Sequence, residues 1–280
     1  MKHKLLTLVV AVVVIASLVI AGCAKPAPAP TPAPSPAPTP APAPSTVKPI
    51  KITCASWEGP EGDNNRVIKM WADELKEKTH GKVEVEIASG AVMAKPAGHY
   101  DLAVNGIADM SLVGLPYTPG CFPMIEICEL PLTGPFCADL TIDKMNEALW
   151  KLYEKGYFDD EFKDTKVLWI GMTLPSIFEM GNGKAIKSFA DFNGKKVRCS
   201  GKWHIEIVKA LGGIPVGLPP TEVYSSLQKG IIDGAYAEYS FINAFRTEDV
   251  LGSVTEEGIS GMQFGIVISM YFFASLPEDV

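Results

Sequence analysis

The chain has 280 residues, of which 47% are apolar and 20% are charged, so it contains enough apolar material for one large or two medium domains. Its formal net charge is −7, and it has no stripe of basic residues. These values argue against a nucleic-acid-binding protein, because such proteins need clustered Lys and Arg to neutralise phosphates.

The first residues have the composition of an export signal. Lys2 and Lys4 precede the apolar run Leu5–Ile20, which is too short and wrongly flanked for a stable membrane span. We therefore expect residues 1–22 to be a signal peptide and the protein to work outside the cytoplasm. The order Ile20-Ala21-Gly22-Cys23 also resembles a bacterial lipoprotein signal, in which Cys23 is acylated and anchors the chain to a membrane. The alternative is an ordinary signal peptide followed by an incidental cysteine.

Residues 23–46 predict a tether between this anchor and the folded part. Every second residue from Pro26 to Pro44 is proline, separated by Ala, Thr or Ser. Such a segment cannot form a core and adopts extended polyproline II. At about 3.1 Å per residue it would hold a folded domain up to roughly 60 Å from the membrane. The alternative is a disordered leader, but the position directly after Cys23 favours a stalk.

The remaining cysteines do not indicate a metal site. Their number is odd, and they are Cys54, Cys121, Cys128, Cys137 and Cys199. An exported compartment permits disulfides, and the three central cysteines are close enough in sequence for one bridge, which we leave unassigned. A zinc site would require paired cysteines two to four residues apart. We therefore expect no bound metal and no cofactor.

The folded part begins with a strand and an amphipathic helix. Ile50–Ser56 reads as the strand, and Asn64 or Asn65 is placed to cap a helix that runs to Thr79. The four-residue spacing of Val67, Trp71 and Leu75 predicts that these side chains form one apolar face of the helix, with Ile68 and Ala72 beside them.

Short apolar runs separated by turn residues continue through the middle of the chain. We expect, in order, a strand at Val83–Ile87, a short helix at Tyr100–Asn105, strands at Ala108–Val113 and Ile125–Leu130, a helix at Asp139–Lys155, a strand at Lys166–Met172 and a loop or hairpin at Phe178–Phe189. The strand at Lys166–Met172 would cross from the first half of the fold to the second.

Residues 195–239 predict a strand-helix-strand-helix-strand unit. The expected strands are Lys195–Cys199, Pro215–Leu218 and Ile231–Tyr236. Ser200 is placed to cap the first helix and Gly230 to end the second. This order implies a parallel sheet, and ligands of such sheets bind outside the carboxyl ends of the strands. Arg198 lies at one of these ends.

Two stretches of the chain repeat one pattern. Tyr100–Asp109 and Tyr224–Asp233 share Tyr-x5-Gly-Ile-x-Asp, at places where a helix ends on glycine and leads into a strand. A repeated helix-strand device predicts two similar lobes.

The C-terminal part predicts a short helix around Phe241–Phe245 and a long buried strand at Gln263–Ala274. Ser275–Asp279 carries the signals that start a helix, with a cap candidate, an early proline and acidic residues. We expect from this that the sequence is a fragment of a longer chain.

Several motifs in order along the chain resemble one family. They are Gly81–Ile87, Asn105-Gly-Ile-Ala-Asp109, Glu129-Leu-Pro131, Asp191–Arg198 and Pro219–Gly234. The chain resembles the DctP-like solute-binding receptors of tripartite ATP-independent periplasmic (TRAP) transporters. The resemblance implies an α/β periplasmic-binding-protein fold with a cleft between two lobes, lobe I from residues 47–168 and 250–280 and lobe II from residues 169–249. It also implies a receptor, not an enzyme, that delivers a small organic acid to an ion-gradient-driven membrane permease.

The resemblance also indicates the ligand anchor. In that family an arginine at the end of this strand pairs with the ligand carboxylate, and Arg198 is the matching residue. The guanidinium is a planar fork of donors that can hold both oxygens of a carboxylate. The other candidate ligand contacts are Trp57, Tyr117, Phe178, Tyr236, Glu238 and Tyr239.

For each of these residues a structural role is the alternative. Trp57 and Tyr117 would be core aromatics, Phe178 a cover for the hinge, and Glu238 a partner in an exposed salt bridge. One of Tyr236, Glu238 and Tyr239 is expected to face the cleft, because all three follow the Asp233-Gly234 turn.

The chain departs from the sialic-acid binders of the family. Those proteins have a second arginine where this chain has Ser176–Glu179, and an asparagine where it has Ala235–Glu238. We therefore expect a more apolar and aromatic pocket, suited to a carboxylate with a hydrophobic body.

Two alternative functions are a ligand-binding sensor lipoprotein and a secreted hydrolase. The chain has no His-Glu-x-x-His, Gly-x-Ser-x-Gly or phosphate-loop motif, which argues against catalysis. His80, His99 and His204 have no ligand-like spacing, and we expect them to be solvated or capping residues.

Overall fold

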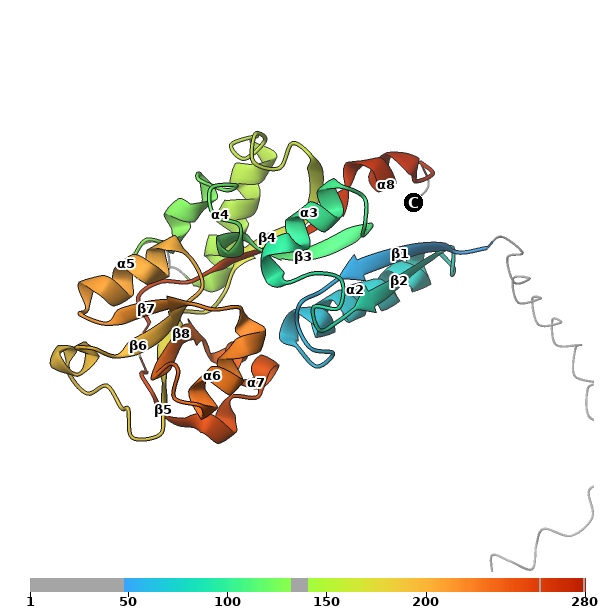
Figure 1. Ribbon diagram of the computed structural model, residues 1–280. Helices are drawn as coiled ribbons and strands as arrows, with labels where there is room; N and C mark the ends of the chain where they lie inside the picture. The colour runs from blue at the N-terminus through green and yellow to red at the C-terminus, as the bar shows by residue number, and fades with distance from the viewer. Residues whose placement is uncertain (1–47, 132–140, 257, 279) are drawn as a thin grey trace, which may run out of the picture. The chain divides into compact units, whose positions relative to one another are not determined.

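The computed structural model describes residues 48–131, 141–256, 258–278 and 280 (Figure 1). The expected signal peptide, Cys23, the tether and Cys137 lie outside these ranges. Within them, none of the helices combines the length and the apolar content that a membrane crossing requires.

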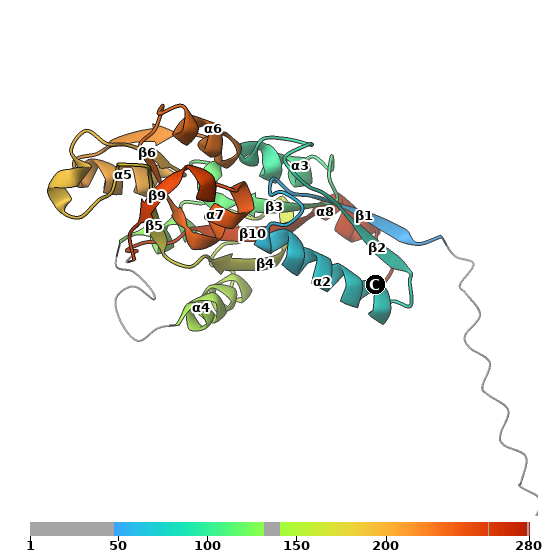
Figure 2. The same cartoon turned by 90° about the horizontal axis from the view of Figure 1, so that it is seen from below.

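The first sheet has five strands in the order β2-β1-β3-β10-β4. β1, β2 and β3 are parallel, whereas β10 is antiparallel to both of its neighbours. The elements of this first lobe are β1 (Ile50–Ala55), α2 (Asp63–Lys78), β2 (Val83–Ala88), α3 (His99–Val104), β3 (Met110–Gly114), α4 (Ile142–Glu154), β4 (Thr165–Met172), β10 (Gln263–Ser269) and α8 (Met270–Ser275). α4 runs alongside β4 (Figure 2).

The second sheet has the order β7-β6-β8-β5-β9. β6, β7 and β8 are parallel, and β5 is antiparallel to β8 and β9. The elements of this second lobe are β5 (Ser176–Gly181), β6 (Lys196–Cys199), α5 (Lys202–Ala210), β7 (Ile214–Gly217), α6 (Val223–Gln228), β8 (Gly234–Glu238), α7 (Tyr239–Phe245) and β9 (Leu251–Val254). The strand-helix-strand-helix-strand unit predicted for residues 195–239 is therefore confirmed.

Short 3₁₀ helices connect many of these elements. They are η1 (Pro96–Gly98), η2 (Leu115–Tyr117), η3 (Ile125–Glu129), η5 (Phe189–Phe192), η6 (Pro220–Glu222) and η7 (Glu248–Val250).

The repeated sequence pattern is built in the same way in both lobes. Asp109 Oδ2 accepts a hydrogen bond from the backbone N–H of Thr53 in β1 at 2.7 Å, and Asp233 Oδ2 accepts one from the N–H of Lys196 in β6 at 2.9 Å. The glycine of each copy, Gly106 or Gly230, has a positive φ of 66° or 67°, which lets the chain turn from the helix into the strand. The two sheets therefore share one internal plan.

Each sheet is covered by helices on both faces. In the second lobe one cluster, which includes Val197, Tyr236 and residues of α5, packs on one face, and another, which includes Ala235, Phe241 and residues of α6, packs on the other. Figure 1 shows α5 on one side of this sheet and α6 and α7 on the other. Because side chains alternate along a strand, Arg198 points to the same face as Ala235.

The inward face of α2 is rotated from the expected one. The buried residues of the helix are Asn65, Ile68 and Ala72, whereas Val67 is 60% exposed and Trp71 37% exposed. The prediction is therefore correct for Ile68 and Ala72, which are buried, and for Leu75, which packs against the core, but Val67 and Trp71 lie at the surface. The helix starts at Asp63 with Gly62 as its N-cap, so neither asparagine is the cap.

Three other elements differ from expectation. Ile125–Leu130 is a 3₁₀ helix with no strand pairing in the described structure. Phe178–Phe189 begins inside β5, which is a central strand and not a loop. The expected strand Gln263–Ala274 ends at Ser269, because its antiparallel partner strands begin at Met110 and Thr165, and the chain continues as α8.

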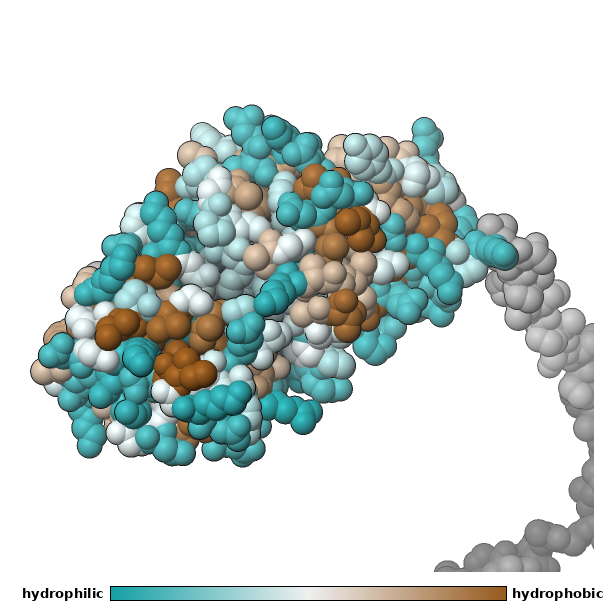
Figure 3. All heavy atoms as spheres, viewed as in Figure 1, coloured by the Kyte–Doolittle hydropathy of each residue, from teal (hydrophilic) through white to brown (hydrophobic). Residues whose placement is uncertain are grey.

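The expected lobe boundaries at residues 168 and 250 do not coincide with those of the sheets. β4 stays in the first sheet as far as Met172, and β9, which follows residue 250, pairs with β5 in the second. Polar and charged residues cover much of the face seen in Figure 3, and the apolar patches between them are separate from one another.

Candidate functional site

The Arg198 guanidinium is completely buried at the carboxyl end of β6. Its Nε donates to the carbonyl oxygen of Leu218 at 3.1 Å, and its Nη2 donates to the hydroxyl of Tyr117 at 3.2 Å. The cation lies 5.8 Å from the ring centre of Tyr117 and 5.2 Å from that of Phe241. Nη1 has no hydrogen-bond partner among the described residues. A permanent buried charge with an unused donor has the chemistry needed to bind an anion.

No salt bridge in the described part of the chain involves Arg198. Its charge is instead stabilised by the carbonyl oxygen of Leu218, the hydroxyl of Tyr117 and the ring faces of Tyr117 and Phe241. Buried arginines usually need a charged partner, because removing a cation from water is costly.

Tyr117 comes to the arginine from the first lobe. It ends η2, directly after β3, and Gly114 makes room for it, since a Cβ at Gly114 would lie 2.5 Å from the Tyr117 ring. Gly201, at the start of α5, is similarly close to Pro116, which a Cβ there would approach to 2.7 Å. Both glycines thus permit the close approach of segments that carry the site.

A cluster of aromatic rings borders the arginine. Trp57, which follows β1, packs edge-on against Tyr117 at 5.6 Å and against Phe264 at 5.5 Å, and it stacks on Phe245 of α7 at 6.2 Å. Its side chain is buried, and its indole Nε1 has no hydrogen-bond partner among the described residues. The contacts of Trp57 therefore reach both lobes.

Three buried carboxyl groups, Glu58, Glu179 and Glu238, share this region with Arg198. Burial raises the pKa of Glu58 and of Glu238, and burial together with the charge of Glu238 raises the pKa of Glu179 to about 9. Arg198 acts in the opposite direction on the pKa values of Glu179 and Glu238. The site therefore contains more acidic groups than cations.

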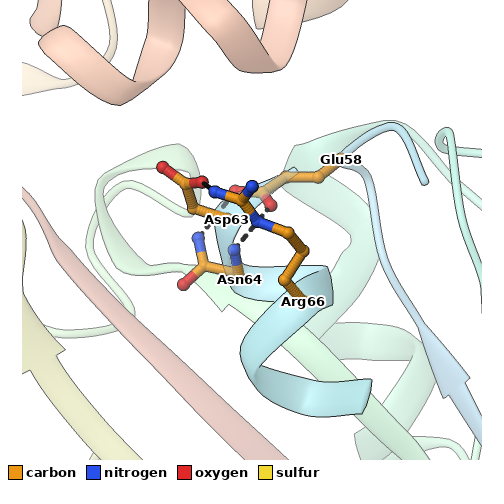
Figure 4. Close-up of polar contacts among 4 residues, drawn as sticks. All are labelled: Glu58, Asp63, Asn64 and Arg66. Atoms are coloured by element: carbon orange, nitrogen blue, oxygen red, sulfur yellow. Dashed lines mark hydrogen bonds and ion pairs between the residues drawn. The ribbon is translucent and has the colours of Figure 1, made fainter. Parts of the chain in front are cut away.

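Glu58 differs from the other two in being held by hydrogen bonds. Its Oε1 accepts from Asn64 Nδ2 at 2.6 Å and its Oε2 accepts from the Asn64 backbone N–H at 3.1 Å. Figure 4 shows the carboxylate at the first turn of α2, beside the ion pair between Asp63 and Arg66. A carboxylate in this position satisfies a free N–H and complements the helix dipole. A Cβ at Gly62 would lie 2.3 Å from Glu58 Oε2, so glycine is needed there.

A cavity of about 220 Å³ is lined by Tyr117 and Leu218, the two residues that accept hydrogen bonds from Arg198, whereas Arg198 itself does not line it. Its other lining residues include Pro116 from the first lobe and Cys199 and Ser200 from the second. Lys95 and Glu222, at 3.5 Å, form an exposed ion pair between residues that also belong to the two lobes.

Comparisons with known proteins agree with this geometry. A model of bacterial extracellular solute-binding proteins, family 7 (DctP), matches residues 60–280. The chain belongs to this family. A solute-binding protein of Albidiferax ferrireducens is 27% identical over 229 residues, which are 78% of this chain and 64% of that protein.

Solved TRAP solute-binding proteins have the same fold. A marine metagenome protein specific for aromatic acids, in complex with 3-hydroxybenzoate, has a TM-score of 0.76 and 25% identity, and the match covers 82% of this chain and 72% of that one. A Bordetella bronchiseptica protein with bound mandelate has a TM-score of 0.73 and 29% identity over 82% and 72% of the two chains. The prediction of a two-lobed DctP-type fold is confirmed.

This family 7 chain spans between 55% and 64% of the length of three curated relatives that it matches. In the family and its solved members the named role is solute binding. No group of three or more His, Cys, Asp or Glu side chains within the described ranges is arranged to hold a metal ion.

The structure brings together four of the seven predicted site residues, Arg198, Trp57, Tyr117 and Glu238. Phe178 and Tyr236 lie elsewhere: their rings stack on each other at 4.3 Å on the α5 face of the second sheet, opposite the face that carries Arg198. There they border a separate hollow of about 670 Å³. Tyr239 is 46% exposed at the start of α7.

The expectation for two histidines is wrong. His99 and His204 are completely buried, and neither is solvated. His204 Nδ1 lies 2.7 Å from Ser200 Oγ, and its Nε2 lies 3.5 Å from Ser176 Oγ. Burial, with a contribution from the Arg198 charge, lowers the pKa of His204 to about 3.

Sequence reasoning missed Glu58, Glu179 and Phe241. Glu179 carried the clearest signal, because a lone acidic residue stands in the otherwise apolar run Ser176–Gly181. A buried carboxyl in a central strand is rare unless it has a partner or a function.

Proposed function

We propose that this chain is an extracytoplasmic receptor that binds a small organic acid and delivers it to an ion-gradient-driven permease of the TRAP type. The observation that carries the proposal is Arg198, which is fully buried, without an acidic partner among the described residues, and with Nη1 unused. A ligand carboxylate at Nη1 would complete its hydrogen bonds and neutralise its charge.

The aromatic rings define the second part of the proposed pocket. Trp57, Tyr117 and Phe241 surround the arginine, and Glu238 lies at the end of β8. The solved relatives that are 25–29% identical bind 3-hydroxybenzoate, benzoate and mandelate. A carboxylate with a compact hydrophobic body fits both observations. The proposed contacts do not include Phe178 and Tyr236, whose rings lie on the α5 face, or Tyr239, which is exposed.

Ligand binding would favour the closed form of the two lobes. Arg198 belongs to the second lobe, and Tyr117 and Trp57 belong to the first. A ligand that contacts both lobes binds the closed form better than the open form, so it shifts the population toward closure. The lobes would comprise residues 48–172 with 258–280, and residues 173–256.

The N-terminal segment would place this receptor at a membrane. We include in the proposal that residues 1–22 are removed, that Cys23 is acylated, and that residues 23–46 act as a stalk. A lipid anchor and a stiff spacer keep a receptor near its permease without inserting it. Mass spectrometry of the protein purified from its native membrane, before and after Cys23→Ser, tests this part.

A hydrolase would need a nucleophile and a base in the cleft, and Ser200 and His204 are within hydrogen-bond distance. Three observations argue against catalysis by this pair. With a pKa near 3, His204 is a weak base. No carboxylate among the described residues orients it, since its second nitrogen faces Ser176. His204 is also fully buried.

The test is a thermal-shift and calorimetric titration with benzoate, 3-hydroxybenzoate and mandelate, each compared with its uncharged amide. We expect at least one acid, and no amide, to raise the melting temperature. Arg198→Met should abolish this shift, while Arg66→Met, which removes an exposed arginine, should keep it. Equal stabilisation of the wild type and Arg198→Met, with both shown to be folded by circular dichroism, would contradict the proposal.

A further inference from the structure

The unused hydrogen-bonding atoms around Arg198 are of two opposite kinds. Two are donors, Arg198 Nη1 and Trp57 Nε1. The others belong to carboxyl groups, both oxygens of Glu179 and Oε2 of Glu238. None of these atoms has a partner among the described residues, and all four side chains are at least nine-tenths buried. An anion alone would satisfy only the donors.

The sheet places Glu179 and Arg198 on the same face. Ala235 of β8 pairs with Arg198 of β6 on one side and with Glu179 of β5 on the other. The three side chains therefore form one row, in which the small methyl group of Ala235 separates the carboxyl group from the guanidinium. Neighbouring strands are about 4.8 Å apart, so the Cα atoms of Arg198 and Glu179 are roughly 10 Å apart. A small ligand can span this distance.

The unpartnered carboxyl oxygens favour a ligand that brings its own hydrogen-bond donors. Both carboxyl oxygens of Glu58 already accept hydrogen bonds from Asn64. Glu179 and Glu238, in contrast, have no basic partner among the salt bridges of the described residues. A simple monocarboxylate would neutralise Arg198 and leave two buried carboxyl groups with unsatisfied oxygens, which is unfavourable in a low-dielectric site. A carboxylate that also carries a positive nitrogen would pair with both ends.

We propose that the ligand is a small zwitterion, an amino or imino acid, whose carboxylate binds Arg198 and whose protonated nitrogen binds Glu179 and Glu238. The inference rests on the proposed function, since it assigns the ligand class of the same site. The nitrogen supplies two or three N–H donors, which matches the number of unsatisfied carboxyl oxygens.

Two alternatives make different predictions. In the first, Glu179 is a protonated core acid without a ligand role, and its raised pKa reflects only its burial and the neighbouring Glu238. Replacing it by glutamine would then leave ligand preference unchanged. In the second, the ligand is a hydroxy acid, whose hydroxyl donates a single hydrogen bond to one carboxyl. Hydroxy acids would then bind as tightly as their amino analogues.

The experiment uses matched ligand pairs with the folded wild-type chain. Calorimetry at pH 7.5 compares phenylglycine with mandelate, which differ by an ammonium and a hydroxyl group, and pipecolate with cyclohexanecarboxylate. We expect the nitrogen-bearing member of at least one pair to bind tenfold or more tightly than its partner. Equal binding, or tighter binding of the hydroxy or simple acid, would overturn the inference and leave the receptor function intact.

Variants assign the effect to the two carboxyl groups. Glu179→Gln and Glu238→Gln should each reduce the preference for the nitrogen-bearing ligand by tenfold or more, and should leave or improve the binding of the simple acid. Glu129→Gln is the matched control, because Glu129 is also a buried glutamate but belongs to the first lobe, next to Gln263. A preference that survives both site variants would also overturn the inference. If no acid of either class binds the wild type, the receptor function itself fails.

Discussion

The hydroxyl of Tyr117 accepts a hydrogen bond from Nη2 of Arg198 at 3.2 Å, although the two residues are 81 positions apart in the chain. Tyr117 follows β3 of the first sheet, and Arg198 lies on β6 of the second. The same tyrosine ring also faces the cation and packs against Trp57. This contact therefore links the anchor of the proposed ligand to the opposite lobe.

Tyr117→Phe tests that link, because it removes the hydroxyl and keeps the ring. We expect ligand affinity to fall three- to tenfold, since a hydrogen bond to a charged group contributes about 1.5 kcal/mol and the retained ring limits the loss. Isothermal titration with an acid that binds the wild type measures the change. Tyr271→Phe, at an exposed position, is the control. An unchanged affinity would show that the contact does not support binding.

The repeat and the strand-helix unit were predictable because each depends on local chemistry. Glycine with a positive φ at Gly106 and Gly230, and an aspartate three residues later, are features of short segments. Arg198 was identified for a different reason, because the motif Asp191–Arg198 resembles a family in which an arginine at this position pairs with the ligand carboxylate, and its role stays a prediction. These features do not require knowledge of what packs against them.

The errors share a physical cause, which is tertiary packing. Phe178 and Tyr236 are two of the candidate ligand contacts, but alternation along β5 and β8 directs their rings to the α5 face. The alternating pattern of a strand shows that it has two faces, but not which of them is covered by helices and which meets the cleft. The same applies to α2, which has two apolar stripes. Only the stripe with Ile68 and Ala72 is buried, whereas the stripe with Val67 and Trp71 lies at the surface.

Glu58→Ala is expected to destabilise the first lobe. The substitution removes the acceptor for the Asn64 backbone N–H and an acidic group at the start of α2. Loss of a helix cap costs about 0.5–2 kcal/mol of unfolding free energy. Urea denaturation followed by circular dichroism measures the change. Glu61→Ala, which removes a nearby exposed acid, is the control. If both variants are equally stable, Glu58 does not act as a cap.

Asp109→Ala and Asp233→Ala should have similar effects, each in its own lobe. Each aspartate accepts one backbone N–H bond from a neighbouring strand, at Thr53 and at Lys196, so each variant leaves one strand N–H without its acceptor. We expect a loss of about 1–3 kcal/mol for either change. Hydrogen exchange should show increased exchange of Thr53 in the first variant and of Lys196 in the second. Increased exchange in the wrong lobe, or none, would contradict the equivalence of the two motifs.

The buried His204 predicts an acid-sensitive contribution to stability. Burial and the Arg198 charge lower its pKa in the folded protein to about 3, against an ordinary value of 6.5. Between these values the unfolded chain binds more protons than the folded chain, so the free energy of unfolding decreases as the pH falls from 6.5 toward 3. The expected slope is up to about 1.4 kcal/mol per pH unit for this single group.

His204→Gln removes this titration and keeps a side chain that can hydrogen-bond to Ser200. The readout is the unfolding free energy of the wild type minus that of the variant, measured as a function of pH, because the substitution also changes the stability at pH 7. We expect this difference to shrink as the pH falls from 6.5 to 4, because only the wild type carries the buried imidazole that must remain neutral. His80→Gln, which removes an exposed histidine, is the control variant. Urea unfolding at four or five pH values in this range provides the measurement, and a constant difference for His204→Gln would mean that this histidine is not held neutral by the fold.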